Sequence, residues 1–109
     1  MQGNRYNDGK LKWSLVDYKA LEPMVKVLDY GTLKYAPHNW KKGLLVTEVC
    51  ESMLRHIHAF LDCENNDPES GLPHIGHIQC NAMFLGAMVK RPDMDDRVDP
   101  KQFELKLDE

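Results

Sequence analysis

The segment from Leu45 to Asp62 repeats its apolar residues with the period of an α-helix, and this pattern constrains the fold more than any other part of the sequence. One broad face of the predicted helix carries Val46, Val49, Cys50, Met53, Leu54, Ile57, Phe60 and Leu61. Apolar residues also recur at helical spacing in segments 17–35 and 73–90, where Pro23 fits only in the first turn of a helix. Because no segment alternates apolar and polar residues, the sequence predicts an all-α fold.

The chain length fits a single domain with a polar extension. Its 109 residues can form one hydrophobic core without disulfides or a structural metal. Residues 90–109 contain seven acidic and five basic residues, which indicates a loosely held tail. Within this tail, residues 102–107 either form a short element that docks on a neighbouring subunit or are disordered. We therefore predict a helical domain over residues 1–89 and a C-terminal acidic tail over residues 90–109.

The charge and cysteine content narrow the class of protein. A formal net charge of −3 argues against a protein that binds nucleic-acid polymers without sequence preference, because such proteins collect Lys and Arg. Cys50, Cys63 and Cys80 form no Cys-x-x-Cys pair, so we expect a reducing compartment. No apolar run approaches the roughly 18 residues of a membrane span, and we expect no membrane partner and a cytoplasmic location.

The other face of the predicted helix at 45–62 is polar. It carries Glu48, Glu51, Arg55, His58 and Asp62. Glu48 and Glu51 lie one turn apart, and two such carboxylates can converge on Mg²⁺ or Mn²⁺. An ordinary solvated helix face, with an ion pair between Glu51 and Arg55, explains the same pattern.

The third predicted helix has a polar stripe that continues into the core. The stripe consists of His74, His77 and Asn81, followed by Phe84, Leu85 and Met88. Polar groups in such a place must be hydrogen-bonded or bind a ligand, so both core histidines and metal-ligating histidines remain open. A structural zinc site is disfavoured, because Cys80 points about 120° away from His74 on a helix.

Aromatic and basic residues gather in the N-terminal half of the chain. They are Lys10, Trp13, Tyr30, Lys34, Tyr35, Asn39 and Trp40. Aromatic rings can stack on a base, an asparagine can read a base edge, and lysines can contact phosphates. Packing in a core is the other explanation for the aromatic residues.

Taken together, four ordered motifs resemble the phage dATP/dGTP diphosphohydrolase family, which includes MazZ-type enzymes and is related to the all-α MazG-like nucleotide pyrophosphohydrolases. The motifs are Asp8-Gly-Lys10 with Trp13; Tyr30-Gly-x-x-Lys34-Tyr35 with Asn39-Trp40; Arg55-His56; and Asp67-Pro-Glu-Ser-Gly-Leu-Pro-His74-x-x-His77-x-x-x-Asn81. The resemblance covers roughly residues 7–85. It implies a MazG-like helical bundle, with its site between helices and completed by formation of a homodimer or homotetramer.

The resemblance implies an enzyme that hydrolyses a purine deoxynucleoside triphosphate, dGTP or dATP, to the monophosphate and pyrophosphate. Mg²⁺ or Mn²⁺ is the implied cofactor, with Glu48 and Glu51 as principal ligands and either able to act as base toward water. The family's second pair of acidic ligands is replaced here by His74 and His77. Further ligands or orienting groups are expected from the loop carboxylates Glu64 and Asp67.

The resemblance also implies roles in substrate binding. Arg55, Lys34 and Lys10 are expected to contact phosphates, and Asn39 and Trp40 the base or sugar. The remaining candidates for the substrate site are Trp13, Tyr30, Tyr35 and Asn81. If the chain is phage-encoded, the expected location is the host cytoplasm. A helical module that senses a nucleotide or binds a protein, without turnover, is the alternative function.

Overall fold

Each segment with helical spacing forms a helix in the computed structural model, which describes residues 9–33, 38–39 and 43–98. The helices are α1 (Glu22–Gly31), α2 (Val46–Leu61) and α3 (His74–Met88), preceded by two short 3-10 turns, η1 (Trp13–Leu15) and η2 (Lys19–Leu21). No β-strand occurs in these described ranges. Within them, β-type backbone pairing is limited to one antiparallel bridge between Asn66 and Pro73. The predicted all-α fold is confirmed, and Pro23 lies in the first turn of α1 as expected.

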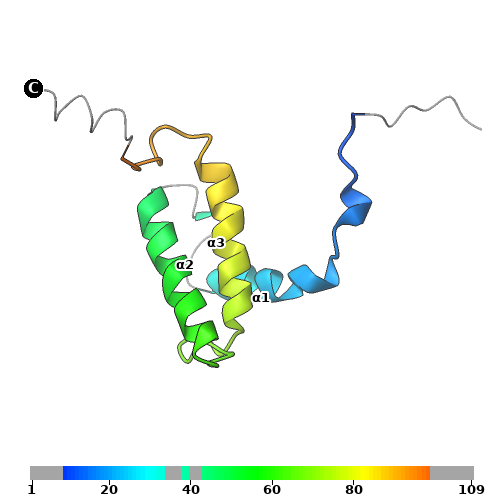
Figure 1. Ribbon diagram of the computed structural model, residues 1–109, viewed down its shortest axis with the longest axis vertical. Coiled ribbons are helices and arrows are strands. Elements are labelled where there is room, and N and C mark those ends of the chain that lie inside the picture. Colours follow the sequence, from blue (N-terminus) through cyan, green and yellow to red (C-terminus); the bar gives the residue numbers. More distant parts are fainter. Residues whose placement is uncertain (1–8, 34–37, 40–42, 99–109) are drawn as a thin grey trace, which may run out of the picture.

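Helices α2 and α3 lie side by side as an antiparallel hairpin, and α1 crosses behind α3 (Figure 1). The crossing of α1 and α3 depends on Gly76, because a β-carbon at this position would lie 2.7 Å from the backbone carbonyl carbon of Pro23 and closer still to its oxygen. The Gln79 side chain adds a hydrogen bond from Nε2 to the Ala20 carbonyl, at 2.8 Å. These contacts fix the N-terminal end of α1 against α3, and Tyr30, near the other end of α1, lines the pocket beside the α2–α3 hairpin.

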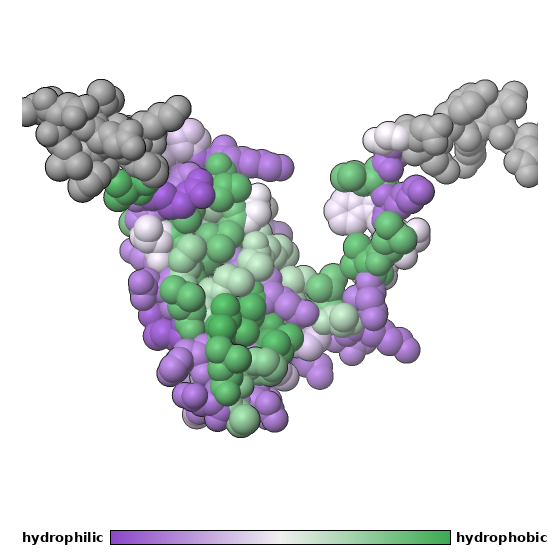
Figure 2. Space-filling view, in the orientation of Figure 1, coloured by the Kyte–Doolittle hydropathy of each residue, from purple (hydrophilic) through white to green (hydrophobic). Residues whose placement is uncertain are grey.

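The core is small and lies at the end of the hairpin where α2 begins. Its buried members are Val46, Val49, Met88 and Met94, against which Leu44, Cys50, Phe84 and Leu85 pack. The broad apolar face of α2 is only partly buried, because Leu54, Phe60 and Leu61 are 59%, 40% and 71% exposed. Because α3 covers only one side of α2, the rest of the apolar face meets solvent, as the green area over both helices in Figure 2 shows.

The residues that follow α3 are attached to the start of α2. Met94 is 2% exposed, and its carbonyl accepts a hydrogen bond of 2.9 Å from the Val46 N–H. The next N–H along α2, from Thr47, donates to Oδ1 of Asp96 at 2.9 Å, and the Thr47 hydroxyl donates to Oδ2. The first N–H groups of a helix have no acceptors within the helix. Here Met94 and Asp96 provide the acceptors for Val46 and Thr47. Up to Asp96, therefore, the predicted tail is not loosely held, because it completes α2.

The remaining part of the predicted tail, residues 99–109 with the expected element at 102–107, lies outside the described residues. The domain boundary at residue 90 stays a prediction. Among the helices that the structure describes, none is long and apolar enough for a transmembrane segment.

Candidate functional site

A polar pocket of about 470 Å³ lies between the three helices and the loop that joins α2 to α3. Its wall includes Tyr30 from α1; Ser52, Arg55 and His56 from α2; Glu64, Asp67, Glu69 and Ser70 from the loop; and His74 and His77 from α3. Three imidazoles, three carboxylates and one guanidinium in one concavity form a site that can bind a polar, charged ligand.

The loop is shaped by its own hydrogen bonds. Asp67 accepts the Gly71 N–H on its backbone oxygen at 2.7 Å and the Ser70 N–H on its side chain at 3.2 Å, while its own N–H donates to the Leu72 carbonyl at 2.8 Å. Gly71 adopts a φ of +72°, a conformation that glycine reaches without steric cost. The sequence Asp-Pro-Glu-Ser-Gly therefore forms a tight turn that presents Asp67 and Ser70 to the first turn of α3.

His74 connects the loop to α2 through both of its ring nitrogens. Its side chain is almost completely buried, its Nε2 lies 2.8 Å from Oε1 of Glu64, and its Nδ1 lies 2.8 Å from Nδ1 of His56. A buried imidazole needs partners for both nitrogens, and here both are satisfied. Glu64, His74 and His56 thus form a continuous hydrogen-bonded chain from the loop into the pocket.

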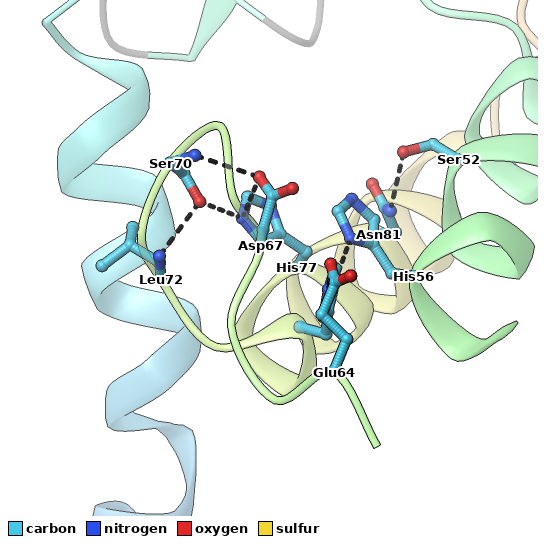
Figure 3. A network of polar contacts seen from close by, with 9 residues as sticks. Ser52, His56, Glu64, Asp67, Ser70, Leu72, His77 and Asn81 are labelled. Atoms are coloured by element: carbon cyan, nitrogen blue, oxygen red, sulfur yellow. Dashed lines mark hydrogen bonds and ion pairs between the residues drawn. The ribbon is translucent and has the colours of Figure 1, made fainter. Parts of the chain in front are cut away.

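His77 lies against the face of the His56 ring. Its ring stacks on that of His56 with a centroid distance of 4.4 Å and an interplanar angle of 1°. Its Nε2 lies 2.8 Å from Oγ of Ser70 and 3.6 Å from Oδ2 of Asp67 (Figure 3). The His56 ring is therefore fixed from two sides, by a hydrogen bond to His74 and by stacking on His77.

Burial and neighbouring groups shift the proton affinities in the pocket. Burial, assisted by nearby His77 and His74, lowers the pKa of His56, and burial also lowers the pKa of His77 despite the carboxylate of Asp67. Burial alone would raise the pKa of Asp67, but hydrogen bonds from the Ser70 side chain and backbone outweigh it and lower that pKa. These shifts favour the uncharged imidazoles of His56 and His77 and the ionised carboxylate of Asp67.

Several residues predicted for the site do line this pocket. They are Tyr30, Arg55, Glu64, Asp67, His74 and His77. Asn81 lies beside it, where its Nδ2 donates to Oγ of Ser52 at 3.3 Å. The structure does not bring Lys10, Trp13 or Asn39 to the pocket: all three are exposed, and the first two lie on the N-terminal arm that extends from the bundle in Figure 1. Lys34, Tyr35 and Trp40 lie outside the described residues.

The predicted metal ligands Glu48 and Glu51 are exposed on α2 and do not line the pocket. Glu48 lies one helical turn before Ser52, however, on the same stripe of α2 that continues into the pocket through Arg55. Within residues 9–33, 38–39 and 43–98, no three His, Cys, Asp or Glu side chains are grouped as they would be around a metal ion. Burial raises the pKa of the Cys80 thiol to about 11.

Sequence reasoning left Ser52, His56, Glu69 and Ser70 out of the site. A signal existed for the first two, which are polar, lie four residues apart, and stand at the border between the apolar and polar faces of α2. The positions of Glu69 and Ser70 depend on the turn of the loop, which helical periodicity does not reveal.

The fold and the site define an all-α protein with a pocket of histidines and carboxylates. The family model of the N-terminal part of dATP/dGTP diphosphohydrolases matches residues 1–97, so the chain belongs to this family. It is 33% identical over 98 residues to a dATP/dGTP diphosphohydrolase of Salmonella phage PMBT28. The matched region covers 89% of this chain but spans only about a third of that relative, 33% of its length. No solved structure matches the chain.

Proposed function

We propose that this chain carries the nucleotide site of a diphosphohydrolase that converts a purine deoxynucleoside triphosphate, dGTP or dATP, to the monophosphate and pyrophosphate. The observation that carries the proposal is the pocket of histidines and carboxylates, which lies wholly within the region matched by the dATP/dGTP diphosphohydrolase family. The name of the phage relative supports the same reaction. A MazG-like arrangement of helices is part of the proposal.

The residues of the pocket have distinct tasks in this proposal. Arg55 is a permanent cation at its edge and binds the triphosphate. Tyr30, at the C-terminal end of α1, offers an aromatic face to the base. Asn81 and Ser52 hold each other in place beside the histidines, so their effect on the substrate is exerted through the shape of the pocket.

We propose Mg²⁺ or Mn²⁺ as cofactor, held by Glu48 and Glu51. Both carboxylates are exposed, and neither has a hydrogen bond or ion pair with another described residue. Oxygen donors of this kind fit Mg²⁺, which proteins commonly bind through one or two carboxylates plus substrate phosphates. When bound, the cation would supply neutralisation of the triphosphate charge.

Glu64, Asp67, His74 and His77 are already hydrogen-bonded within the pocket. The proposal therefore gives these four residues the task of shaping and orienting the pocket. Their direct ligation of a metal stays a prediction from the sequence.

A product assay tests the function. The 109-residue chain is incubated with each common dNTP and NTP, with Mg²⁺ and Mn²⁺ compared, and release of monophosphate and pyrophosphate is measured. We expect dGTP or dATP to be the best substrate. Glu48→Gln and Glu51→Gln should each abolish release, whereas Glu22→Gln, which changes an exposed carboxylate of α1, should not. Thermal stabilisation by dGTP without any product would favour the nucleotide-sensing module, and no effect of any nucleotide would favour a protein-binding module.

The exposed apolar edge of α2 supports assembly as a homodimer or homotetramer, which is also part of this proposal. Leu54 and Leu61 lie seven residues apart on one side of the helix and are both largely exposed. A second copy would bury them and enlarge a small core. Light scattering should give a mass above 12.6 kDa, Leu54→Glu should lower it, and the control Val98→Glu should leave it unchanged. A well-folded monomer would contradict this assembly.

A further inference from the structure

The hydrogen-bonded chain from Glu64 through His74 to His56 determines where the protons of these side chains lie. A carboxylate only accepts hydrogen bonds, so at 2.8 Å from Glu64 the Nε2 atom of His74 must carry a proton and donate it. In its uncharged form, His74 then has only Nδ1 left as an acceptor. For that form, the contact of 2.8 Å between the two Nδ1 atoms requires His56 to donate from its own Nδ1.

This assignment leaves the other nitrogen of His56, Nε2, with a free lone pair. His56 lines the pocket, and its Nε2 has no hydrogen-bond partner in the part of the chain that the structure describes. The parallel ring of His77, at 4.4 Å, prevents His56 from turning away. An uncharged imidazole held in one orientation, with a bare nitrogen facing a polar pocket, has the properties of a general base.

We propose that Nε2 of His56 removes the proton from the attacking water, and that His74 and Glu64 are positioning residues that hold His56 in the required tautomer. This inference rests on the proposed function. As the water oxygen forms its bond to the α-phosphorus, the bond from that phosphorus to the bridging oxygen breaks and pyrophosphate leaves with the electron pair. The water proton moves to Nε2 of His56 and is released to solvent after the product departs.

The same chain stabilises the charge that the proton brings. Protonated His56 donates from Nδ1 to His74, which in turn donates from Nε2 to the negative carboxylate of Glu64. The charge is thus compensated through two hydrogen bonds without a rearrangement of side chains. The proposal gives His56 the role of base, which the sequence had assigned to Glu48 or Glu51.

The first test compares turnover in two histidine variants of α2. His56→Gln keeps a side-chain amide that can donate to Nδ1 of His74, but it has no basic nitrogen. We expect kcat for pyrophosphate release to fall about 10²- to 10⁴-fold, with KM changing much less. The control is His58→Gln, because His58 lies two residues away on the exposed side of α2, where it pairs with Asp62. Its kcat should stay within about twofold of wild type. A His56→Gln variant with wild-type kcat would overturn the proposal.

The second test removes the imidazole and returns it from solution. His56→Ala leaves space next to His77 and Ser52, and we expect free imidazole to raise its kcat in a saturable manner. The same additive should not change the kcat of wild type or of His58→Gln. Restoration by imidazole would support proton transfer, whereas a loss that imidazole cannot restore would overturn the role of base.

The third test observes the tautomers directly and does not depend on turnover. Long-range ¹H–¹⁵N NMR spectra of the labelled chain, recorded above the titration range of histidine, distinguish protonated from bare ring nitrogens. We expect His56 protonated at Nδ1 and His74 protonated at Nε2. Glu64→Gln should give His56 a mixture of both tautomers, because an amide can donate as well as accept. The kcat of this variant should fall at least about tenfold, which is the usual cost of removing a residue that orients a functional histidine.

These results separate the failure of this inference from failure of the proposed function. A wild-type chain that releases no pyrophosphate from any dNTP would refute the function, while the NMR spectrum would still decide the tautomers. An active chain in which His56 is protonated at Nε2, or in which Glu64→Gln leaves its tautomer unchanged, would overturn the inference and leave the function standing.

Discussion

Gly76 of α3 lies against Pro23 of α1 so closely that a β-carbon on Gly76 would be 2.7 Å from the Pro23 carbonyl carbon and would overlap the Pro23 oxygen. Contact at this distance is possible only between bare backbones. It fixes where α1 crosses α3, within one turn of the histidines of the pocket, and so places Tyr30 at the pocket wall. The position of the site therefore depends on a residue that has no side chain.

Gly76→Ala should destabilise the protein. The new methyl group would meet a carbonyl that belongs to a helix and cannot turn aside, and overpacking of this kind costs about 1–3 kcal/mol. Gly86→Ala is the control, because it lies in the same helix and a β-carbon there would have nothing within 4 Å. In a helix interior that change should stabilise by about 0.5–1 kcal/mol. Urea denaturation monitored by circular dichroism gives both values, and equal effects of the two substitutions would contradict the close crossing.

Met94→Ala should lower the free energy of unfolding by about 2–5 kcal/mol, because it leaves a cavity in the core beside Val46. Met83→Ala, at a position in α3 that is partly exposed, should cost much less. Chemical denaturation of both variants measures the difference. If Met94→Ala were as mild as Met83→Ala, the residues after α3 would not belong to the core.

The carboxylate of Asp96 should stabilise the start of α2 in a pH-dependent way. Hydrogen bonds from Thr47 lower the pKa of Asp96 below its ordinary value of 3.8. A carboxyl group with a lower pKa in the folded state contributes stability above its unfolded-state pKa and loses it as the pH falls through the folded-state pKa. Asp96→Asn should therefore reduce Tm at neutral pH, and the gap to wild type should close in acid, below a pH of about 4. Asp93→Asn, in an exposed pair with Arg91, should show a smaller gap at neutral pH.

The histidines of the pocket should make the protein less stable in mild acid. Because the pKa values of His56 and His77 are lowered in the folded state, the unfolded chain binds more protons at these positions. Stability is then fully present above the unfolded histidine pKa of about 6.5 and is lost as the pH falls through the folded-state values. Scans of Tm from about pH 8 to about pH 5, in EDTA, should show this decline, and His77→Gln should reduce its slope.

The helices could be predicted because their signal is local. α2 begins and ends within one residue of the predicted segment, and α3 within two, since the period of apolar residues reflects the geometry of the helix itself. Which part of an apolar face is buried is a different question. Leu54 and Leu61 satisfy the same periodicity as Val46 and Val49, yet only the latter pair is buried, because α3 and the residues around Met94 cover one part of the face.

Much of the candidate site could also be predicted. The stripe of His74, His77 and Asn81 indicated buried polar groups in α3, and the loop carboxylates Glu64 and Asp67 were expected beside them. The central position of His56 was not expected, because it results from contacts with residues 18 and 21 positions further along the chain.

The sequence by itself determined the helices, the family and most of the chemical groups available to the site. These properties follow from residue types and short spacings, which act through the local geometry of the backbone. Only the tertiary structure decided that Gly76 brings α1 against α3, that Asp96 completes α2, and that His56 lies between His74 and His77. Each of these relationships joins groups that are distant along the chain, and each is selected by close packing or by the need of a buried polar atom for a partner.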